Sequence, residues 1–161
     1  MEIIMKIVIE NLSYHREYLD IVVDWLYSKW GNNNYNYWKS WVESSLSVYD
    51  VPQTFVILVD GEIAGTYSLW RCDLQSRQDL FPWFGGLYVT PKYRGKSFNG
   101  TKLGEHMLLH AREQLQRLGY KEAYLFTEKD AKYYVRNGWV EMGITQDEKD
   151  NNVCLCKLIV D

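Results

Sequence analysis

The spacing of hydrophobic side chains changes along this chain, and each spacing predicts a different element. Residues 18–30 and 101–118 carry apolar side chains three or four positions apart, as in an amphipathic helix. Residues 6–10 alternate between apolar and polar positions, as in a strand with one buried face. The whole pattern predicts a strand, two helices, a hairpin, a strand, a helix, a strand, a helix and two closing strands, at residues 6–10, 18–30, 37–48, 54–59 with 62–70, 83–90, 101–118, 123–127, 130–137, 139–143 and 152–160.

Turn residues support this order. Asp60 and Gly61 separate two strand-like runs, and such a pair readily takes the positive φ values of a tight hairpin turn. Pro91 ends the strand at residues 83–90, and a loop of small residues then leads into the helix at 101–118. We therefore expect an α/β (α+β) fold in which one strand-loop-helix unit can hold a phosphate-bearing ligand.

Composition narrows the class of protein. A chain of 161 residues, 47% hydrophobic and 24% charged and without an internal repeat or linker, predicts one compact domain over residues 1–161. A net charge of -3 argues against a general nucleic-acid binder. The sequence has no run of eighteen apolar residues and therefore predicts no membrane span. Its first residues include charged ones and are unlike a signal peptide. Cys72, Cys154 and Cys156 lack CxxC spacing, so we expect reduced thiols in a cytoplasmic protein.

The loop after residues 83–90 carries the chemistry that the sequence reveals. Unpaired amides at the start of a helix, together with the helix dipole, form a ready site for an anion. Arg94 and Lys96 add positive charge, and Gly95 and Gly100 allow the backbone to approach a diphosphate closely. An ordinary surface turn would show much of the same composition, so the loop alone does not decide between the two.

Four segments in their order resemble the GNAT superfamily of acetyltransferases. They are LYVTPKYRGK, TKLGEHMLLHAREQL, EAYLFTEKD and AKYYVRNGWVEMG, and the resemblance spans about residues 6–143. Its most specific part is the pair VTPKYRGK and YYVRNGW, the latter similar to the family's aromatic-Tyr-x-x-x-Gly-aromatic segment. The resemblance implies a mixed, mostly antiparallel sheet of about six or seven strands flanked by about four helices.

The same resemblance implies how acetyl-coenzyme A would bind. The backbone of Leu87, Tyr88 and Val89 would hold the pantetheine arm, with the Val89 amide polarising the thioester carbonyl. The loop would surround the pyrophosphate with Arg94, Gly95, Lys96, Ser97, Phe98, Asn99, Gly100 and Thr101. The loop departs from the usual Gln/Arg-x-x-Gly-x-Gly/Ala pattern, because Ser97 and Asn99 take the two small positions and Gly100 comes one place late. Either these residues form the loop, or it carries a one-residue insertion.

Acetyl transfer to an amine needs a base and an acid. A lysine-like ammonium of pKa about 10.4 is neutral only about once in 2,500 at pH 7, a handicap near 4.6 kcal/mol. Residues 81–90 contain no acidic side chain, so Glu128 and ordered waters leading to solvent are the candidates for the base. Tyr134 matches the family's tyrosine near the sulfur and would protonate the departing thiolate. Its alternative role is packing on the sheet.

The acceptor and partners are less defined. Tyr35 and Trp38, in an aromatic cluster with Tyr37 and Trp41, would form a wall for a cationic amine or would pack in the core. We expect a primary amine of a small molecule or peptide as the substrate, with no metal, membrane or nucleic-acid partner. The resemblance allows a homodimer through the C-terminal strands, which nothing in residues 153–160 requires. A catalytically silent acyl-coenzyme A binding or sensing module is the alternative function, and a purely structural domain is a third.

Overall fold

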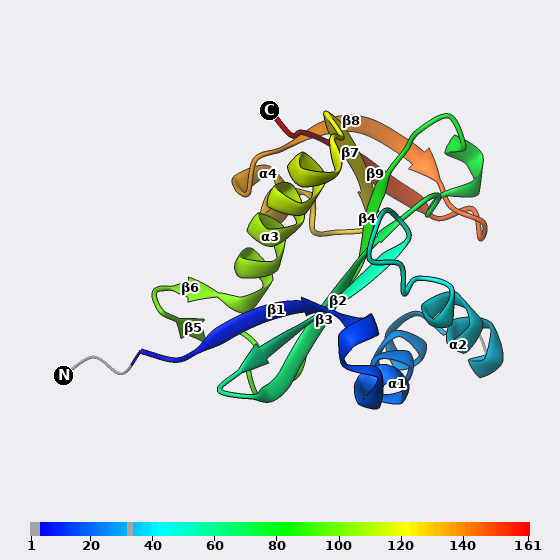
Figure 1. The fold of residues 1–161 in the computed structure, drawn as a ribbon. Coiled ribbons are helices and arrows are strands. Elements are labelled where there is room, and N and C mark those ends of the chain that lie inside the picture. Colours follow the sequence, from blue (N-terminus) through cyan, green and yellow to red (C-terminus); the bar gives the residue numbers. More distant parts are fainter. Residues whose placement is uncertain (1–3, 32–33) are drawn as a thin grey trace. The chain divides into compact units, whose positions relative to one another are not determined.

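The computed structural model describes residues 4–31 and 34–161 (Figure 1). Its helices are α1 (Leu19–Trp30), α2 (Tyr35–Glu43), α3 (Leu103–Leu118) and α4 (Ala131–Arg136). Its strands are β1 (Ile7–Asn11), β2 (Gln53–Val59), β3 (Glu62–Trp70), β4 (Trp83–Val89), β5 (Ser97–Phe98), β6 (Thr101–Lys102), β7 (Glu122–Thr127), β8 (Trp139–Gln146) and β9 (Asn152–Ile159). Short 3-10 turns cover Leu12–Tyr14, Arg16–Tyr18 and Gln75–Arg77.

The main sheet has seven strands in the order β1-β2-β3-β4-β7-β9-β8, with β4 parallel to β7. A mixed, mostly antiparallel sheet with four helices was predicted, and the structure confirms it. The chain divides into two compact units, Met1–Ser68 with Gly86–His110 and Leu69–Gly85 with Ala111–Asp161. One domain over residues 1–161 remains a prediction.

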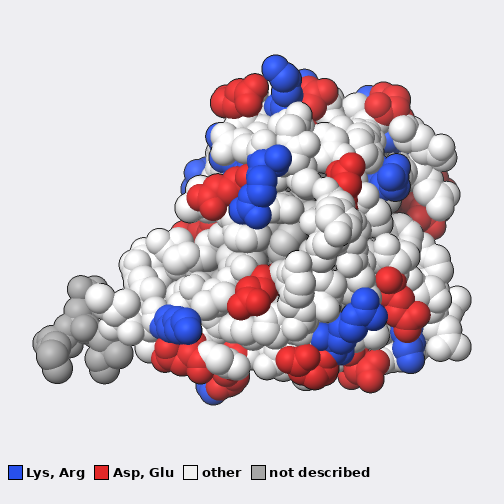
Figure 2. All heavy atoms as spheres, in the orientation of Figure 1, with Lys and Arg blue, Asp and Glu red and all other residues white. Residues whose placement is uncertain are grey.

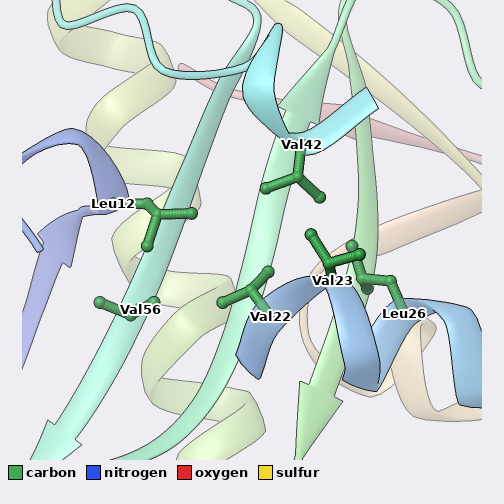
Figure 3. Packing of buried hydrophobic residues seen from close by; sticks show 6 residues of the cluster. All are labelled: Leu12, Val22, Val23, Leu26, Val42 and Val56. Carbon is green, nitrogen blue, oxygen red and sulfur yellow. The ribbon is translucent and has the colours of Figure 1, made fainter. Parts of the chain in front are cut away.

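The first unit is built on the β1-β2 pair and the helices α1 and α2. β1 pairs antiparallel with β2, from Ile7 opposite Val59 to Asn11 opposite Phe55. Asp60 and Gly61 have φ values of 48° and 83°, which confirms the tight turn between β2 and β3. Aliphatic side chains from α1 and α2 pack with those of β2 and the turn after β1 (Figure 3): Leu12, Val22, Val23, Leu26, Val42 and Val56.

Two details of these helices differ from the prediction. Trp30 continues the apolar spacing predicted for residues 18–30, but the residue is 40% exposed because it is the last residue of the helix. The second helix was expected to reach residue 48 but ends at Glu43. The Ser44 and Ser45 hydroxyls donate to the carbonyls of Trp41 and Val42, at 2.7 Å each. Serine side chains that bond the backbone in this way compete with helix continuation.

The second unit contains the antiparallel strands β7, β9 and β8. β7 pairs with β9 from Glu122 opposite Ile159, and the β8-β9 register shifts between Glu141 and Gly143. At the start of β4, Trp83 lies opposite Tyr124 of β7, and both rings are buried. The unit therefore places the beginning of β4 against the strand that follows α3 in the sequence.

The surface charge is mixed. Figure 2 shows acidic and basic side chains interspersed over the visible face. No helix within residues 4–31 and 34–161 combines the length and the apolar character needed to cross a membrane.

Candidate functional site

The carboxyl end of β4 holds the backbone groups predicted to bind a pantetheine arm. Gly65 of β3 packs directly against the Tyr88 carbonyl, and the Thr90 amide donates to the Ala64 carbonyl at 2.9 Å. Carbonyls of successive residues in a strand point to opposite edges, so those of Leu87 and Val89, on either side of Tyr88, point away from β3. This edge is where a ligand chain could pair with β4.

Two cationic side chains bind these carbonyls in this structure. The Lys29 ammonium donates to the Leu87 carbonyl at 3.2 Å, and the Arg94 Nε donates to the Val89 carbonyl at 2.6 Å. The Arg94 guanidinium also lies 5.0 Å from the centre of the Tyr88 ring, on which Trp25 of α1 stacks. A guanidinium has five N–H donors, and the bond from Nε to Val89 uses one of the five in Arg94.

The loop after β4 has a buried aromatic residue on its inner side and exposed cationic residues on its outer side. The Tyr93 and Arg94 amides both donate to the Thr90 carbonyl, forming a turn that ends at Gly95 with φ 70°. Tyr93 is buried and meets Phe98 edge-on at 5.4 Å. Arg94 and Lys96 are exposed, as an anion site requires.

The structure corrects the expected start of the following helix. Residues 101–102 were predicted as helix, but they pair with Ser97 and Phe98 in a two-stranded ribbon, and α3 begins at Leu103. Asn99 and Gly100 have φ values of 53° and 82°, the type I′ turn that Asn-Gly favours. The amides at the mouth of the helix therefore belong to Leu103 and its successors, whereas Asn99 and Gly100 lie at the tip of the ribbon.

Two side-chain contacts anchor the ribbon near its turn. The Asn99 side chain accepts from the Met5 amide at 3.0 Å and donates to the Met5 carbonyl at 2.8 Å. The His106 Nε2 on α3 lies 3.1 Å from the Phe98 carbonyl. Asn99 thus forms part of the turn and also bonds the segment before β1.

Tyr134, the predicted acid, lies among aromatic rings in the second unit. The centre of its ring is 6.4 Å from that of Phe84 in β4 and 6.3 Å from that of Trp139 in β8. Burial, assisted by the charges of Tyr133 and Asp130, raises the pKa of the Tyr134 phenol. The hydroxyl is therefore protonated at neutral pH and can act only as a proton donor in its resting form.

Asp73 is a candidate that the sequence did not reveal. It follows β3 in the chain, and its Oδ2 lies 2.8 Å from the point where a side chain at Gly85 would place its Cβ. Burial of the carboxyl, assisted by the charge of Glu148, raises its pKa to about 7. Some surface of the residue stays exposed. A single aspartate in a polar connection carries no sequence signal, because its enclosure depends on the absent side chain at position 85.

Glu128, the predicted candidate for the base, occupies a different place. It is exposed beyond the end of β7, on a surface depression of about 540 Å³. The depression is lined by Glu128, Lys129, Ala131, Lys132, Glu141, Gly143, Ile144 and Cys154. Charges of both signs and open access make this an ordinary solvated surface.

The predicted acceptor residues lie on α2. Tyr35 meets Tyr27 of α1 edge-on at 5.5 Å, and both Tyr35 and Trp38 pack partly against the aliphatic core. Burial, then a hydrogen bond to Asp24 and the charges of Asp24 and Asp20, raise the pKa of Tyr35. The aromatic surface is thus accompanied by carboxylates, which suit a cation.

The histidines and cysteines form no common site within the described ranges. His106 contacts Phe98, His110 bonds the Tyr67 hydroxyl at 2.6 Å, and His15 bonds Glu10 at 2.7 Å. No group of three or more potential metal ligands gathers in residues 4–31 and 34–161, and Cys72, Cys154 and Cys156 are free thiols.

Comparison with known proteins identifies a family. Residues 50–141, more than half of the chain, match the sequence model described as acetyltransferase (GNAT) domain. No curated protein matches the sequence at a significant level.

Solved structures share the fold at low sequence identity. An aminoglycoside 6'-N-acetyltransferase in complex with coenzyme A superposes with a TM-score of 0.76 at 12% identity, over 96% of this chain and 97% of that chain. The aminoglycoside 6'-N-acetyltransferase from Enterococcus faecium gives 0.71 at 12% identity, over 96% and 97%. A spermidine N-acetyltransferase chimera from Vibrio cholerae and hSSAT gives 0.68 at 14% identity, over 96% and 95%. Identities this low establish the fold alone.

Proposed function

The chain belongs to the GNAT acetyltransferase family, and on this premise we propose that it moves an acetyl group from acetyl-coenzyme A to a primary amine by direct transfer. The acceptor is a small molecule or peptide, and the whole chain acts as one domain in the cytoplasm. The observation that carries the proposal is Arg94, an exposed cation next to Gly95 in the sequence, whose Nε donates to the Val89 carbonyl at the end of β4.

Residues of the first unit suit a diphosphate carrier. Arg94 and Lys96 supply two exposed positive charges after β4, and the first amides of α3 add the positive end of a helix dipole. The proposed diphosphate site includes Arg94, Gly95, Lys96, Ser97, Phe98, Asn99, Gly100 and Thr101. Anchoring of the ribbon at Met5 and His106 supports a preformed loop.

The end of β4 would hold the pantetheine arm through Leu87, Tyr88 and Val89. An arriving arm would take the carbonyls to which Lys29 and Arg94 now donate, and the Val89 amide would polarise the thioester carbonyl. Acetyl-coenzyme A supplies an activated acyl group with a thiol leaving group, so no covalent enzyme intermediate is needed. Positioning of two bound substrates would supply much of the rate.

Tyr134 would act as the general acid. The phenol is protonated at neutral pH and has a proton to give to the departing sulfur, and its raised pKa makes it a weaker acid than an ordinary tyrosine. The acceptor would lie along Tyr35 and Trp38, where Asp20 and Asp24 favour a cationic amine. The fold is shared with enzymes whose names specify aminoglycosides and spermidine, both polyamines, which supports an amine as acceptor.

A silent acyl-coenzyme A binding module is the second candidate. The ribbon at Ser97–Lys102 replaces the usual loop, and this observation favours weaker or altered cofactor use. Both functions require acetyl-coenzyme A to bind, so only turnover distinguishes them.

Two measurements test the proposal. A thermal-shift series with acetyl-coenzyme A should show stabilisation of roughly 2.7 kcal/mol at a hundred times the dissociation constant. Thiol release should then be followed with a panel containing spermidine, an aminoglycoside, free lysine and a short peptide. Binding with thiol release matched by acetylated product supports the enzyme. Binding without transfer to any amine favours the silent module, and absence of binding contradicts both.

A further inference from the structure

A carboxyl group fills the space beside Gly85 in β4. A Cβ at this position would lie 2.6 Å from the Trp70 ring and 2.8 Å from the Asp73 Oδ2. Gly85 therefore leaves space beside β4. The carboxyl of Asp73, twelve residues earlier and in the connection after β3, lies in that space. Gly85 precedes Leu87 by two residues in the sequence of the same strand.

We propose that Asp73 is the general base of the acetyl transfer and that the acceptor binds as a cationic primary ammonium. This inference rests on the proposed function. Residues 81–90 offer no acid of their own, yet an ammonium must lose a proton before it can attack a thioester. Asp73 supplies the carboxylate against β4 that the strand lacks, whereas Glu128 lies exposed beyond β7.

The surroundings of Asp73 make it a stronger base than a surface aspartate. Its carboxyl is enclosed, and the charge acting on it is that of Glu148 in the β8-β9 connection. Trp70 and Gly85 contribute no charge, and Arg77 in the same connection is bound by Asp79 through two hydrogen bonds of 3.0 Å. A pKa of about 7, rather than the usual value near 4, raises basicity by about a thousandfold while leaving half of the group ionised at neutral pH.

The base and the acid approach consecutive residues of β4. Asp73 lies on the side-chain position of Gly85, and Tyr134 packs against Phe84. Side chains of neighbouring strand residues point to opposite faces, so the two groups serve opposite faces of the strand. In acyl transfer the amine adds to one face of the planar thioester carbonyl and the sulfur is expelled from the tetrahedral intermediate, so a base and an acid on either side of the reacting carbon can serve the two steps in turn.

The protons and electrons balance in this arrangement. Asp73 takes one proton from the ammonium, and the freed nitrogen pair forms the C–N bond at the thioester carbonyl. As the C–S bond breaks, its electron pair leaves with the sulfur, which receives a proton from Tyr134. The nitrogen loses its second proton to solvent, and the Tyr134 phenolate takes one proton from solvent to return to its neutral form. The products are an acetamide and the free thiol, and Asp73 releases its proton to solvent.

Asp73→Asn tests the inference, with Asp79→Asn as the matched control in the same connection. Initial rates of thiol release with acetyl-coenzyme A and the best amine of the panel are measured from pH 5.5 to 9.5 for both variants and the wild type. We expect Asp73→Asn to lower kcat/KM at pH 7 by about 10²–10³-fold. It should also abolish the acidic limb of the pH–rate profile, whose midpoint in the wild type should lie near pH 7. Its residual rate should rise about tenfold per pH unit as free amine accumulates. Asp79→Asn should behave as the wild type.

Glu148→Gln provides a second test that spares Asp73. Removal of the neighbouring negative charge lowers the pKa of Asp73, so the acidic limb should move to lower pH. Thermal shift with acetyl-coenzyme A checks that each variant folds and binds the carrier.

The outcomes separate the inference from the proposed function. An unchanged limb in Asp73→Asn or in Glu148→Gln, with an active wild type, overturns Asp73 as the base and leaves acetyl transfer standing. A wild type that binds the carrier but acetylates no amine overturns the proposed function and the base assignment together. Loss of the limb in the first variant with a shift in the second supports Asp73.

Discussion

At its carboxyl end, strand β4 presents backbone carbonyls to exposed cationic side chains, whereas near its start it is enclosed by aromatic rings and an acid. Lys29 and Arg94 meet the Leu87 and Val89 carbonyls on the exposed side. Trp70, Asp73 and Tyr134 crowd Phe84 and Gly85 on the enclosed side. The same strand thus has one end suited to holding a charged ligand and one suited to moving protons.

The difference shows that the surroundings of each residue decide which role it can take along one strand. Exposed cations can release one acceptor and bind another at little cost, because water screens each contact. Enclosed groups change their pKa, since a low-dielectric surrounding disfavours charge. We therefore expect changes at the exposed end to affect affinity and changes at the enclosed end to affect stability and turnover.

Gly85→Ala should have the largest effect. The added methyl meets the Trp70 ring at 2.6 Å, and this ring is only 4% exposed, so it cannot move without repacking. Overpacking of this kind should lower the free energy of unfolding by about 3 kcal/mol. Urea denaturation measures the loss.

Gly95→Ala is the matched change at the exposed end. Its backbone has φ +70° and open space around the position, so the cost is conformational and should be about 1 kcal/mol. If Gly95→Ala destabilised the protein as much as Gly85→Ala, the contrast between the two ends would be wrong.

Tyr134→Phe should reduce kcat by about 10–100-fold and leave the affinity for acetyl-coenzyme A within about twofold. The phenyl ring keeps its packing on Phe84 and Trp139 and loses only the proton donor. Steady-state kinetics with calorimetric binding distinguish the roles. Wild-type turnover in this variant would leave Tyr134 with a packing role alone.

Arg94→Ala should weaken binding of acetyl-coenzyme A by about tenfold, and the loss should shrink as salt rises. Lys92→Ala is the control, because it removes an equal charge from the same loop, but its ammonium is bound to Glu62 at 2.9 Å. Calorimetric titration at low and high salt measures both. Equal losses in the two variants would mean that net charge, and not the placement of Arg94, attracts the carrier.

Asp73→Asn should stabilise the protein more at pH 8 than at pH 5. The folded state holds the Asp73 proton up to a pKa of about 7, whereas the unfolded chain releases it near pH 4. Stability therefore falls as the pH rises from about 4 to 7, and this loss disappears in the variant. We expect a difference of about 1 kcal/mol between the two pH values, after allowing for the exposed part of the residue. An equal effect of the substitution at both pH values would refute the raised pKa.

Much of the fold was predictable because it depends on local pattern. The hairpin turn at Asp60 and Gly61 and the helix predicted at residues 18–30 are encoded by neighbouring residues, and the structure confirms them. The ribbon at Ser97–Lys102 was missed although Asn99-Gly100 is a hairpin signal, since the surrounding loop was interpreted as the entry to a helix.

The candidate site was less predictable, because its parts depend on packing. Arg94 and Lys96 could be predicted to be exposed from their loop, and the placement of the Arg94 Nε on Val89 could not. Asp73 acquires its environment from Trp70, Gly85 and Glu148, which are distant from one another in sequence. Enclosure of a carboxyl by residues so far apart produces no periodic pattern in the sequence.

One measurement tests the central claim most directly: quantification of free thiol and acetylated amine in the same reaction of acetyl-coenzyme A with each amine of the panel. The account predicts that at least one amine yields the two products in a one-to-one ratio, at a rate that requires the folded wild type. Thiol release without acetylated amine, or no release with any amine despite bound acetyl-coenzyme A, would contradict it.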